Sequence, residues 1–287
     1  MAVAPCEVCE NVDFRHLFYK DGFPYQVCKH CGLIRIYPQL TDAELDAIYH
    51  KGYYEQWGGE EAVFSDMKRK TFSALLDRLP PCTPWGRLLD IGAATGILME
   101  VAKERGYDVY GVEASQDGSA AVAEKFGPDR ISNAYFNEHF AAWPPSFFNV
   151  ICMVDLLEHV RRPDQTLRHV FSLLRPGGLL LLYLPDAGSL SRHIAGKYWP
   201  HFIPGHLFSF SRQNISRLLR QSGFTVYHVG SAAKYLTAEY AAFVFSSYQN
   251  PIYKIPARIL RLLPERLAKT PIPVKIGQMA LVAQRDK

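Results

Sequence analysis

The sequence has no long hydrophobic run, no strong excess of either charge and no low-complexity tract. The apolar stretch at 179–184 is far shorter than the roughly 20 residues that span a bilayer, so we expect no transmembrane helix. No basic segment followed by an apolar run opens the chain, which argues against a signal peptide and favours the cytoplasm. The net charge of +4 comes from 32 basic and 28 acidic residues. This mild balance argues against a nucleic-acid-binding protein.

Cysteine is also scarce, but four of the six cysteines lie in the first 31 residues. Cys6 and Cys9 form one Cys-x-x-Cys pair, and Cys28 and Cys31 form another after an interval of 18 residues. Two such pairs supply four thiolates to one tetrahedral zinc ion. The alternatives are a redox pair and two disulfides, but a reducing cytoplasm disfavours disulfides and neither pair opens a helix after a strand. We therefore predict a structural Zn²⁺ in a module at 1–40.

Strands and helices alternate from residue 87 onward, which predicts an α/β fold with a parallel sheet wrapped by helices. The expected strands cover 87–91, 108–112, the surroundings of 131, 148–154, 179–184, 224–229 and 278–283. We expect the intervening helices to end at Gly106, Gly127 and Gly177, because glycine commonly stops a helix. The residues at 81–287 are therefore predicted to form the main domain.

The segment at 41–80 is predicted to be a helical lead-in that contributes to the cleft of the main domain. Thr41 and Glu44 have the spacing of a capping box, and apolar residues recur at helical spacing after Phe64. The segment at 235–277 is interpreted as a helical cap inserted before the last strand. Its basic and apolar part at 255–269 contacts either the protein body or a membrane surface, and the first reading is favoured.

The stretch LLDIGAATG is predicted to be a strand, a glycine turn and a helix start, as in nucleotide-binding corners. Gly92 and Gly96 bracket the turn, which follows Asp90. The turn lacks the lysine of a phosphate-binding P-loop, and Ala occupies the second glycine of the dinucleotide fingerprint. Glu113 closes the next strand, where a carboxylate can accept hydrogen bonds from both hydroxyls of a ribose. With no lysine in the turn, a nucleoside that carries an amino acid fits better than a polyphosphate.

In that order, LLDIGAATG, VYGVEAS, VDLLEHV and LRPGGLLLLYLPD resemble the motifs of class I S-adenosylmethionine-dependent methyltransferases over roughly 80–230. The resemblance implies a Rossmann-like doubly wound sheet, mostly parallel with an antiparallel last strand. It implies that Gly92, Ala93 and Gly96 pack against the methionine and ribose and that Glu113 binds the ribose hydroxyls. The other residues that it places near the cofactor are Asp90, Ala114, Asp155, Leu156 and Tyr54.

Two further segments, CKHCGLIRIYP and GHLFSFSRQNISRLLRQSGF, look like parts of bacterial methyltransferases of the sugar and natural-product type. The resemblance implies a small-molecule acceptor, such as a sugar or an envelope precursor, methylated on oxygen, nitrogen or carbon. In the second segment it places a histidine, here His206, beside the substrate. Methyl transfer needs the removal of one proton from the acceptor, and His206, His201 and Tyr198 are the candidate bases.

Three alternatives stay open at this stage. DLLEH resembles the acidic-x-x-Glu-His set of some quinone O-methyltransferases, which would make Asp155, Glu158 and His159 ligands of a second, divalent metal. An RNA methyltransferase with a zinc recognition module is a second alternative. A non-catalytic binding protein on the same scaffold is the third. The oligomeric state is not predicted.

Overall fold

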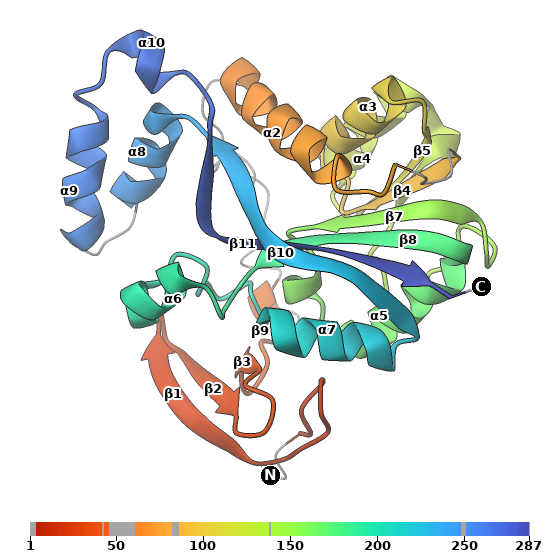
Figure 1. Ribbon diagram of the computed structural model, residues 1–287, viewed down its shortest axis with the longest axis horizontal. Helices are drawn as coiled ribbons and strands as arrows, with labels where there is room; N and C mark the ends of the chain where they lie inside the picture. Colours follow the sequence, from red (N-terminus) through yellow and green to blue (C-terminus); the bar gives the residue numbers. More distant parts are fainter. Residues whose placement is uncertain are drawn as a thin grey trace.

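The computed structural model describes residues 4–41, 43–45, 61–81, 86–137, 139–247 and 251–286. Its largest feature is a seven-stranded sheet in the order β10-β11-β8-β7-β4-β5-β6 (Figure 1). The strands are β4 (Arg87–Ile91), β5 (Asp108–Glu113), β6 (Ile131–Asn133), β7 (Phe148–Val154), β8 (Leu174–Pro185), β10 (Phe224–Leu236) and β11 (Ile272–Arg285). Strands β6, β5, β4, β7 and β8 are parallel, whereas β11 is antiparallel to both β8 and β10. The predicted mostly parallel sheet with an antiparallel last strand is confirmed.

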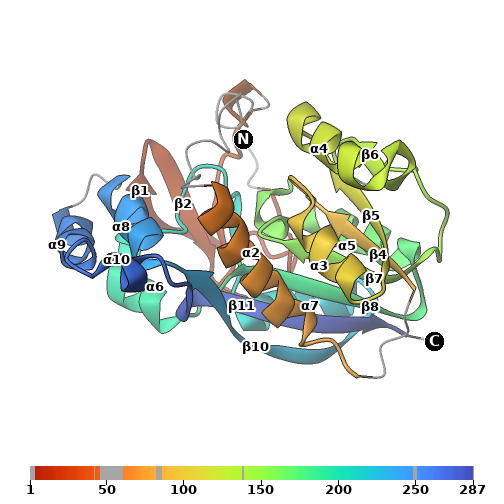
Figure 2. The same cartoon turned by 90° about the horizontal axis from the view of Figure 1, so that it is seen from above.

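Helices cover both faces of this sheet (Figures 1 and 2). They are α2 (Glu61–Leu76), α3 (Ile97–Glu104), α4 (Gln116–Phe126), α5 (Pro163–Leu173), α6 (Leu190–Ala195), α7 (Arg212–Gln221), α8 (Ala238–Ser247), α9 (Pro251–Leu260) and α10 (Glu265–Ala268). Short 3₁₀ turns are η2 (Pro128–Arg130), η3 (Leu157–His159) and η4 (Gly196–Tyr198). Successive side chains of a strand point to opposite faces, so Leu88 joins the core under α2 and α3 while Leu89 joins the core with α5 and α7.

Glycine ends a helix at two of the three positions where the sequence predicts it. Gly106 and Gly127 have φ of 89° and 98°, a left-handed backbone that glycine adopts without a steric penalty, directly after α3 and α4. The predicted stop at Gly177 is wrong, because α5 already ends at Leu173 and β8 begins at Leu174. Pro176 explains the earlier end, since the ring of a proline disfavours a helical backbone in the residue before it.

The last two strands are longer than predicted. Instead of ending at residue 229, β10 continues to Leu236, and β11 begins at Ile272 rather than at 278. The two strands pair along almost their whole length, with two register shifts, the first of which leaves an extra residue in β10 and the second extra residues in β11. Bulges break the alternating pattern on which a strand prediction rests, which explains the underestimate. Helices α8, α9 and α10 lie between Leu236 and Ile272, which are paired.

The N-terminal residues form a second, four-stranded antiparallel sheet in the order β1-β2-β3-β9. Its strands are β1 (Phe14–Lys20), β2 (Phe23–Cys28), β3 (Ile34–Ile36) and β9 (Phe208–Ser209). The fourth strand therefore comes from the main part of the chain, and buried residues of the N-terminal sheet share one hydrophobic cluster with the large sheet.

Among the described residues, no helix combines the length and the apolarity that crossing a membrane requires.

The capping box predicted at Thr41 is present. Thr41 and Glu44 exchange backbone-to-side-chain hydrogen bonds, and residues 43–45 are helical.

Candidate functional site

The glycine corner after β4 has an unusual backbone. Gly92, Ala94 and Gly96 all have positive φ, at 83°, 47° and 83°. A positive φ in Ala94 costs free energy, and such outliers concentrate at ligand sites. A Cβ on Gly92 would meet the Leu156 side chain at 3.4 Å, so Leu156 lies directly over the corner. The amides of the first turn of α3 follow Gly96, as in other sites that bind a polar ligand.

Glu113 is held at the edge of this corner by two backbone amides. Its Oε2 accepts a hydrogen bond of 2.8 Å from the Ala94 N–H, and its Oε1 accepts one of 2.8 Å from Ser115. The side chain is buried. Each carboxylate oxygen has two lone pairs, so one remains on each oxygen for a hydroxyl donor. Asn133 donates to the carbonyl oxygens of Glu113 and Ala114 and thereby fixes the end of β6 against this corner.

Asp90 is buried at the end of β4, close to a second acid. Burial first, and then the Glu113 charge, raise the pKa of Asp90 to about 7, while Lys68 of α2 opposes this shift. Lys68 itself is affected by burial and by Lys234, which lower its pKa to about 8. Four charged side chains therefore surround the corner: Asp90 of β4, Glu113 of β5, Lys68 of α2 and Lys234 of β10. Sequence reasoning missed both lysines, because α2 and β10 lie far from the glycine motif in the chain.

The Asp90 carboxyl predicts a specific pH dependence of stability. Its pKa is higher in the folded protein than in the unfolded chain, so its stabilising contribution is complete below about pH 4 and is lost as the pH rises toward 7. Relative to Asp90→Asn, the wild type should lose roughly 1.4 kcal/mol of unfolding free energy per pH unit in this window. Urea denaturation of both proteins from pH 4 to 8 measures the difference. Parallel stability curves would contradict the assignment.

Asp155 follows β7 and also has a positive φ, of 47°. Its Oδ2 lies 3.2 Å from the Lys234 Nζ, and its Oδ1 lies 3.5 Å from Gln278 Nε2. The acid therefore meets β10 and β11 at the carboxyl end of the sheet, next to Leu156 over the corner. In open α/β sheets, ligands bind at this end of the strands.

Three side chains gather beyond Asp155. Potential ligand atoms of Glu158, His159 and His206 all lie within 4.8 Å of one another, and the rings of the two histidines meet edge to face with centroids 4.6 Å apart. The His159 Nδ1 donates to the Gly205 carbonyl oxygen at 2.8 Å when it carries the proton, which leaves Nε2 with its lone pair. This contact joins the DLLEH segment to the loop that carries His206.

Burial dominates the electrostatics of these three groups. It lowers the pKa of His206 well below 6.5 and also lowers that of His159. It raises the pKa of Glu158 well above its usual range, and neither carboxylate oxygen of Glu158 has a hydrogen-bond partner among the described residues. A neutral imidazole can accept a proton on its unprotonated ring nitrogen. Together with a carboxylate they also form a donor set that suits Zn²⁺ or Mn²⁺ better than Mg²⁺.

The sequence suggested Asp155, Glu158 and His159 as ligands of a second metal. The structure instead groups Glu158 and His159 with His206. His201 lies parallel to His206 with ring centroids 6.3 Å apart, and burial lowers the pKa of His201 to about 4. Tyr198 is 45% exposed, and its carbonyl oxygen accepts a hydrogen bond from the Tyr253 hydroxyl. Tyr54, the remaining cofactor candidate, lies outside the described residues.

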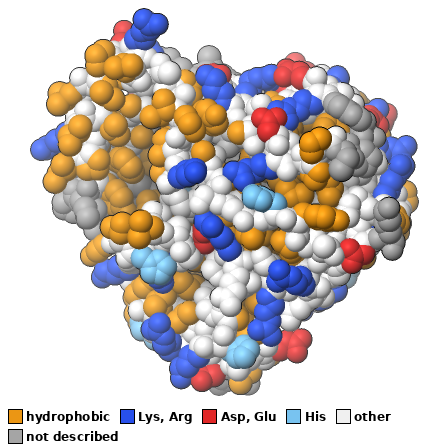
Figure 3. All heavy atoms as spheres, viewed as in Figure 1, with side chains coloured by type: hydrophobic (Ala, Val, Ile, Leu, Met, Phe, Trp, Pro, Cys, Tyr) orange, Lys and Arg blue, Asp and Glu red, His pale blue; other side chains and the backbone are white. Residues whose placement is uncertain are grey.

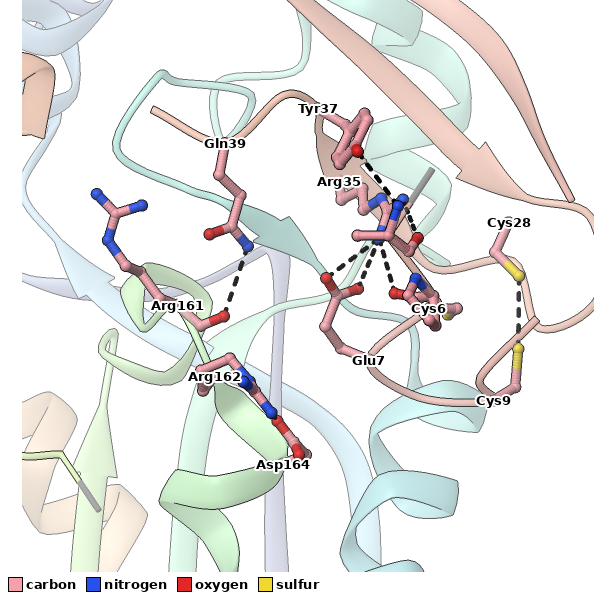
Figure 4. Close-up of polar contacts among 12 residues, drawn as sticks. Cys6, Glu7, Cys9, Cys28, Arg35, Tyr37, Gln39, Arg161, Arg162 and Asp164 are labelled. Atoms are coloured by element: carbon pink, nitrogen blue, oxygen red, sulfur yellow. Dashed lines mark hydrogen bonds and ion pairs between the residues drawn. The ribbon is translucent and has the colours of Figure 1, made fainter. Parts of the chain in front are cut away.

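The four N-terminal cysteines converge, and Figure 4 shows the sulfur atoms of two of them, Cys9 and Cys28, facing each other. Their sulfur atoms all lie within 4.8 Å of one another, and the Cys6–Cys31 and Cys9–Cys28 pairs are each separated by 3.5 Å. Four thiolates at about 2.3 Å from one Zn²⁺ have sulfurs about 3.8 Å apart, so the set fits a tetrahedral site. The separations are too long for disulfide bonds. This geometry supports the zinc module predicted from the sequence.

Arg35 holds this module together, a role that no sequence motif indicates. Its guanidinium is buried and donates to Glu7 and to the carbonyl oxygens of Ala4 and Pro5 (Figure 4). It also lies 3.7 Å from the centroid of the Phe14 ring. A buried guanidinium needs several acceptors at once, and residues 4–7 supply them.

The module also contacts the loop that carries His206. Ile34 and Arg35 pair with β9, and the Ile36 N–H donates to the Leu207 carbonyl oxygen at 3.0 Å. Residue 207 directly follows His206. Further along, Gln39 donates to the carbonyl oxygen of Arg161, just beyond η3 (Figure 4). Hydrogen bonds of β3 with β9 and Leu207, and the bond from Gln39 to Arg161, thus connect the zinc module to the two segments that carry Glu158, His159 and His206.

A cavity of about 500 Å³ lies between α2 and helices α8 to α10. Its lining is mainly apolar and includes Phe64, Met67, Tyr240, Phe243 and Leu263. Phe64 is one helical turn before Lys68, and the lining residue Thr237 is three positions after Lys234, so the cavity neighbours the charged groups of the corner.

The strand order, the glycine corner and Glu113 together define the fold of class I S-adenosylmethionine-dependent methyltransferases. Comparison with known proteins agrees. The chain belongs to the family described as the methyltransferase domain, whose model matches residues 63–229, more than half of the sequence.

Relatives with curated descriptions are similar over shorter segments. The ubiquinone biosynthesis O-methyltransferase of Saccharophagus degradans is 34% identical over 96 residues, which cover 32% of this chain and 40% of that protein. The protein of the same description from Pseudomonas fluorescens is 26% identical over 150 residues, covering 49% and 65%. The matched segment thus spans only about 40% of the length of the first relative.

Solved structures show the same fold at low sequence identity. A S-adenosylmethionine-dependent methyltransferase from Archaeoglobus fulgidus has a TM-score of 0.52 at 18% identity, covering 79% of this chain and all of that one. Phosphoethanolamine N-methyltransferase 2 from Haemonchus contortus, in complex with S-adenosylmethionine, has a TM-score of 0.54 at 16% identity, covering 88% and 62%.

Proposed function

We propose that this protein transfers the methyl group of S-adenosylmethionine to a hydroxyl of a small-molecule acceptor. The observation that carries the proposal is the Glu113 carboxylate, held by two amides beside the glycine corner with one lone pair left on each oxygen. The chain is similar to ubiquinone biosynthesis O-methyltransferases, which favours oxygen over nitrogen or carbon as the acceptor atom. A sugar or another biosynthetic precursor would present such a hydroxyl. The paired thiols of the module suit a reducing cytoplasm.

The charges around the corner suit this cofactor, which carries a sulfonium and an ammonium group beside one carboxylate. Asp90, Glu113 and Asp155 offer negative charge to the two cationic groups, and Lys68 offers positive charge to the carboxylate. Burial and the Glu113 charge raise the pKa of Asp90 to about 7, and a bound cation would favour the ionised carboxylate. Leu156 covers the corner and excludes water from part of it.

In this proposal the transfer is an in-line displacement in which the acceptor oxygen forms a bond to the methyl carbon and the sulfonium leaves as a neutral thioether. Catalysis then depends on positioning and on removal of the hydroxyl proton. His206 is neutral at pH 7, because burial lowers its pKa, and it is our candidate for the group that accepts the proton. Asp155 and Leu156 orient the methionine end.

Glu113 provides the direct test of cofactor binding. In Glu113→Ala we expect S-adenosylmethionine affinity to fall by about 1–3 kcal/mol, the scale of hydrogen bonds to a charged group. Isothermal titration calorimetry measures the change. Asp117→Ala is the matched control, since this acid lies nearby in the first turn of α4 and no role in the site is assigned to it. Equal affinity of wild type and Glu113→Ala would contradict the assigned ribose contact.

A further inference from the structure

Large apolar side chains gather on one side of the molecule, over α8, α9 and α10 (Figure 3). The most exposed is Leu262, at 83%. Along α9 and the turn that continues it, Ile255, Ile259 and Leu262 stand at intervals of four and three residues, so they form one stripe. Hydrogen bonds from Leu262 to Ile259 and from Leu263 to Leu260 extend the helical turn beyond α9. Scattered exposed apolar residues are ordinary, but a contiguous stripe of this kind indicates an interaction surface.

A second stripe on the same helix is basic. It consists of three exposed residues, each directly before a residue of the apolar stripe: Lys254, Arg258 and Arg261. The segment at 251–275 holds six of the 32 lysines and arginines of the chain but only one of its 28 acidic residues. The rest of the protein therefore carries slightly more acidic than basic side chains. The positive net charge of the protein comes from this segment.

We propose that the α9 face, defined by these two stripes, docks on the surface of a bilayer that contains anionic phospholipids. In an interfacial helix the apolar stripe enters the boundary between headgroups and acyl chains, and the adjacent cations lie among the anionic headgroups. The α9 face has this arrangement. Its helix is too short to cross the bilayer, which agrees with a helix that lies in the interface plane.

A second copy of this chain fits the face less well. A two-fold symmetric contact would bring each patch against itself and would place the basic residues of 251–275 opposite one another. Such like-charge pairs oppose association. The apolar stripe also distinguishes the face from a nucleic-acid site, where aromatic side chains that stack on bases accompany the cations. Ile255, Ile259 and Leu262 are aliphatic.

The cavity between α2 and α8–α10 lies beside this face. Phe243, Leu260, Arg261 and Leu263 line it, and Arg261 also belongs to the basic stripe. Part of the cavity lining therefore belongs to the segment that would contact the lipid surface.

Vesicle sedimentation of the full chain tests the proposal. Vesicles of one part phosphatidylglycerol to three parts phosphatidylcholine should bind the wild type, whereas pure phosphatidylcholine should bind it much more weakly. Raising NaCl to about 0.5 M should weaken the binding, because salt screens the headgroup charge. Arg258→Glu changes two charge units and should weaken partitioning about 25-fold, at about fivefold per unit. Leu262→Ser should weaken it about tenfold through lost apolar burial.

Two substitutions elsewhere serve as matched controls. Arg220→Glu makes the same charge change at an exposed position of α7, and Val12→Ser removes an exposed apolar side chain from the N-terminal module. Both should bind the anionic vesicles like the wild type, and all four variants should keep the wild-type melting temperature. No binding to anionic vesicles, or equal binding by Leu262→Ser and Val12→Ser, would overturn the proposal. So would a concentration-dependent dimer that Leu262→Ser abolishes in the absence of lipid.

Discussion

Replacing His206 with alanine is expected to lower kcat by roughly 10²–10⁴-fold while cofactor affinity stays nearly constant. The imidazole lies at the carboxyl end of the sheet, 4.6 Å in ring centroids from His159 and beyond the corner that carries Glu113. Removing it deletes the proton acceptor without touching the corner. Steady-state kinetics at saturating S-adenosylmethionine and calorimetric cofactor binding measure the two effects separately.

Two comparisons separate a proton acceptor from a structural role for His206. His228→Ala removes an exposed histidine of β10 and should leave kcat unchanged. His206→Asn keeps some hydrogen bonding but cannot take up the proton, so it should stay inactive. Rescue of both stability and rate by asparagine would assign His206 to loop packing.

The burial of His206 also predicts how the rate of methyl transfer depends on pH. Because burial lowers the pKa of His206 well below 6.5, the imidazole should stay neutral at mildly acidic pH. The acid limb of kcat in the wild type should therefore lie below pH 6.5, at saturating cofactor.

Loss of zinc is expected to have the largest effect on structure. The purified wild type should contain about one zinc per chain, and Cys28→Ser should lose it and unfold the N-terminal sheet. Apparent binding energies of about 10–16 kcal/mol in small zinc domains leave no stable apo module. Elemental analysis gives the metal content, and hydrogen exchange of residues 4–40 reports the folding. Metal-free wild type with protected N-terminal amides would refute the zinc assignment.

The same substitution should also lower the rate, because β3 pairs with β9 two residues after His206. Cys152→Ala is the matched control. Cys152 is buried in the other hydrophobic cluster, on β7, and its loss should leave the zinc content unchanged. If Cys28→Ser keeps full activity after losing its zinc, the module does not position the His206 loop.

The parts of the fold that the sequence predicted are those set by neighbours in the chain. Leu88 and Leu89 lie on opposite faces of a strand, and Gly106 or Gly127 stops a helix, for reasons that act over a few residues. The glycine corner and Glu113 belong to one strand–helix–strand unit, so their proximity also follows from local order. The convergence of the cysteine pairs was predicted because their spacing indicates a metal site, with a redox pair and disulfides as the alternatives.

Contacts between distant segments account for what was missed. A strand of two residues such as Phe208–Ser209 has no periodicity, so its pairing with β3 cannot be predicted from the sequence. The burial of Arg35 depends on acceptors from residues 4–7, and the approach of His206 to Glu158 depends on the path of the loop after β8. Each is decided by tertiary packing, which residue types alone do not encode.

The pairing of β3 with β9 has a consequence for how the protein is made. The paired residues, Ile34 with Ser209 and Arg35 with Phe208, are more than 170 positions apart. Since synthesis proceeds from the N-terminus, β1, β2 and β3 emerge long before their fourth strand, and the apolar edge of β3 has no partner during that interval. Open strand edges invite pairing with other chains. Zinc uptake can fix the first three strands early, but completion of the N-terminal sheet depends on the last third of the polypeptide.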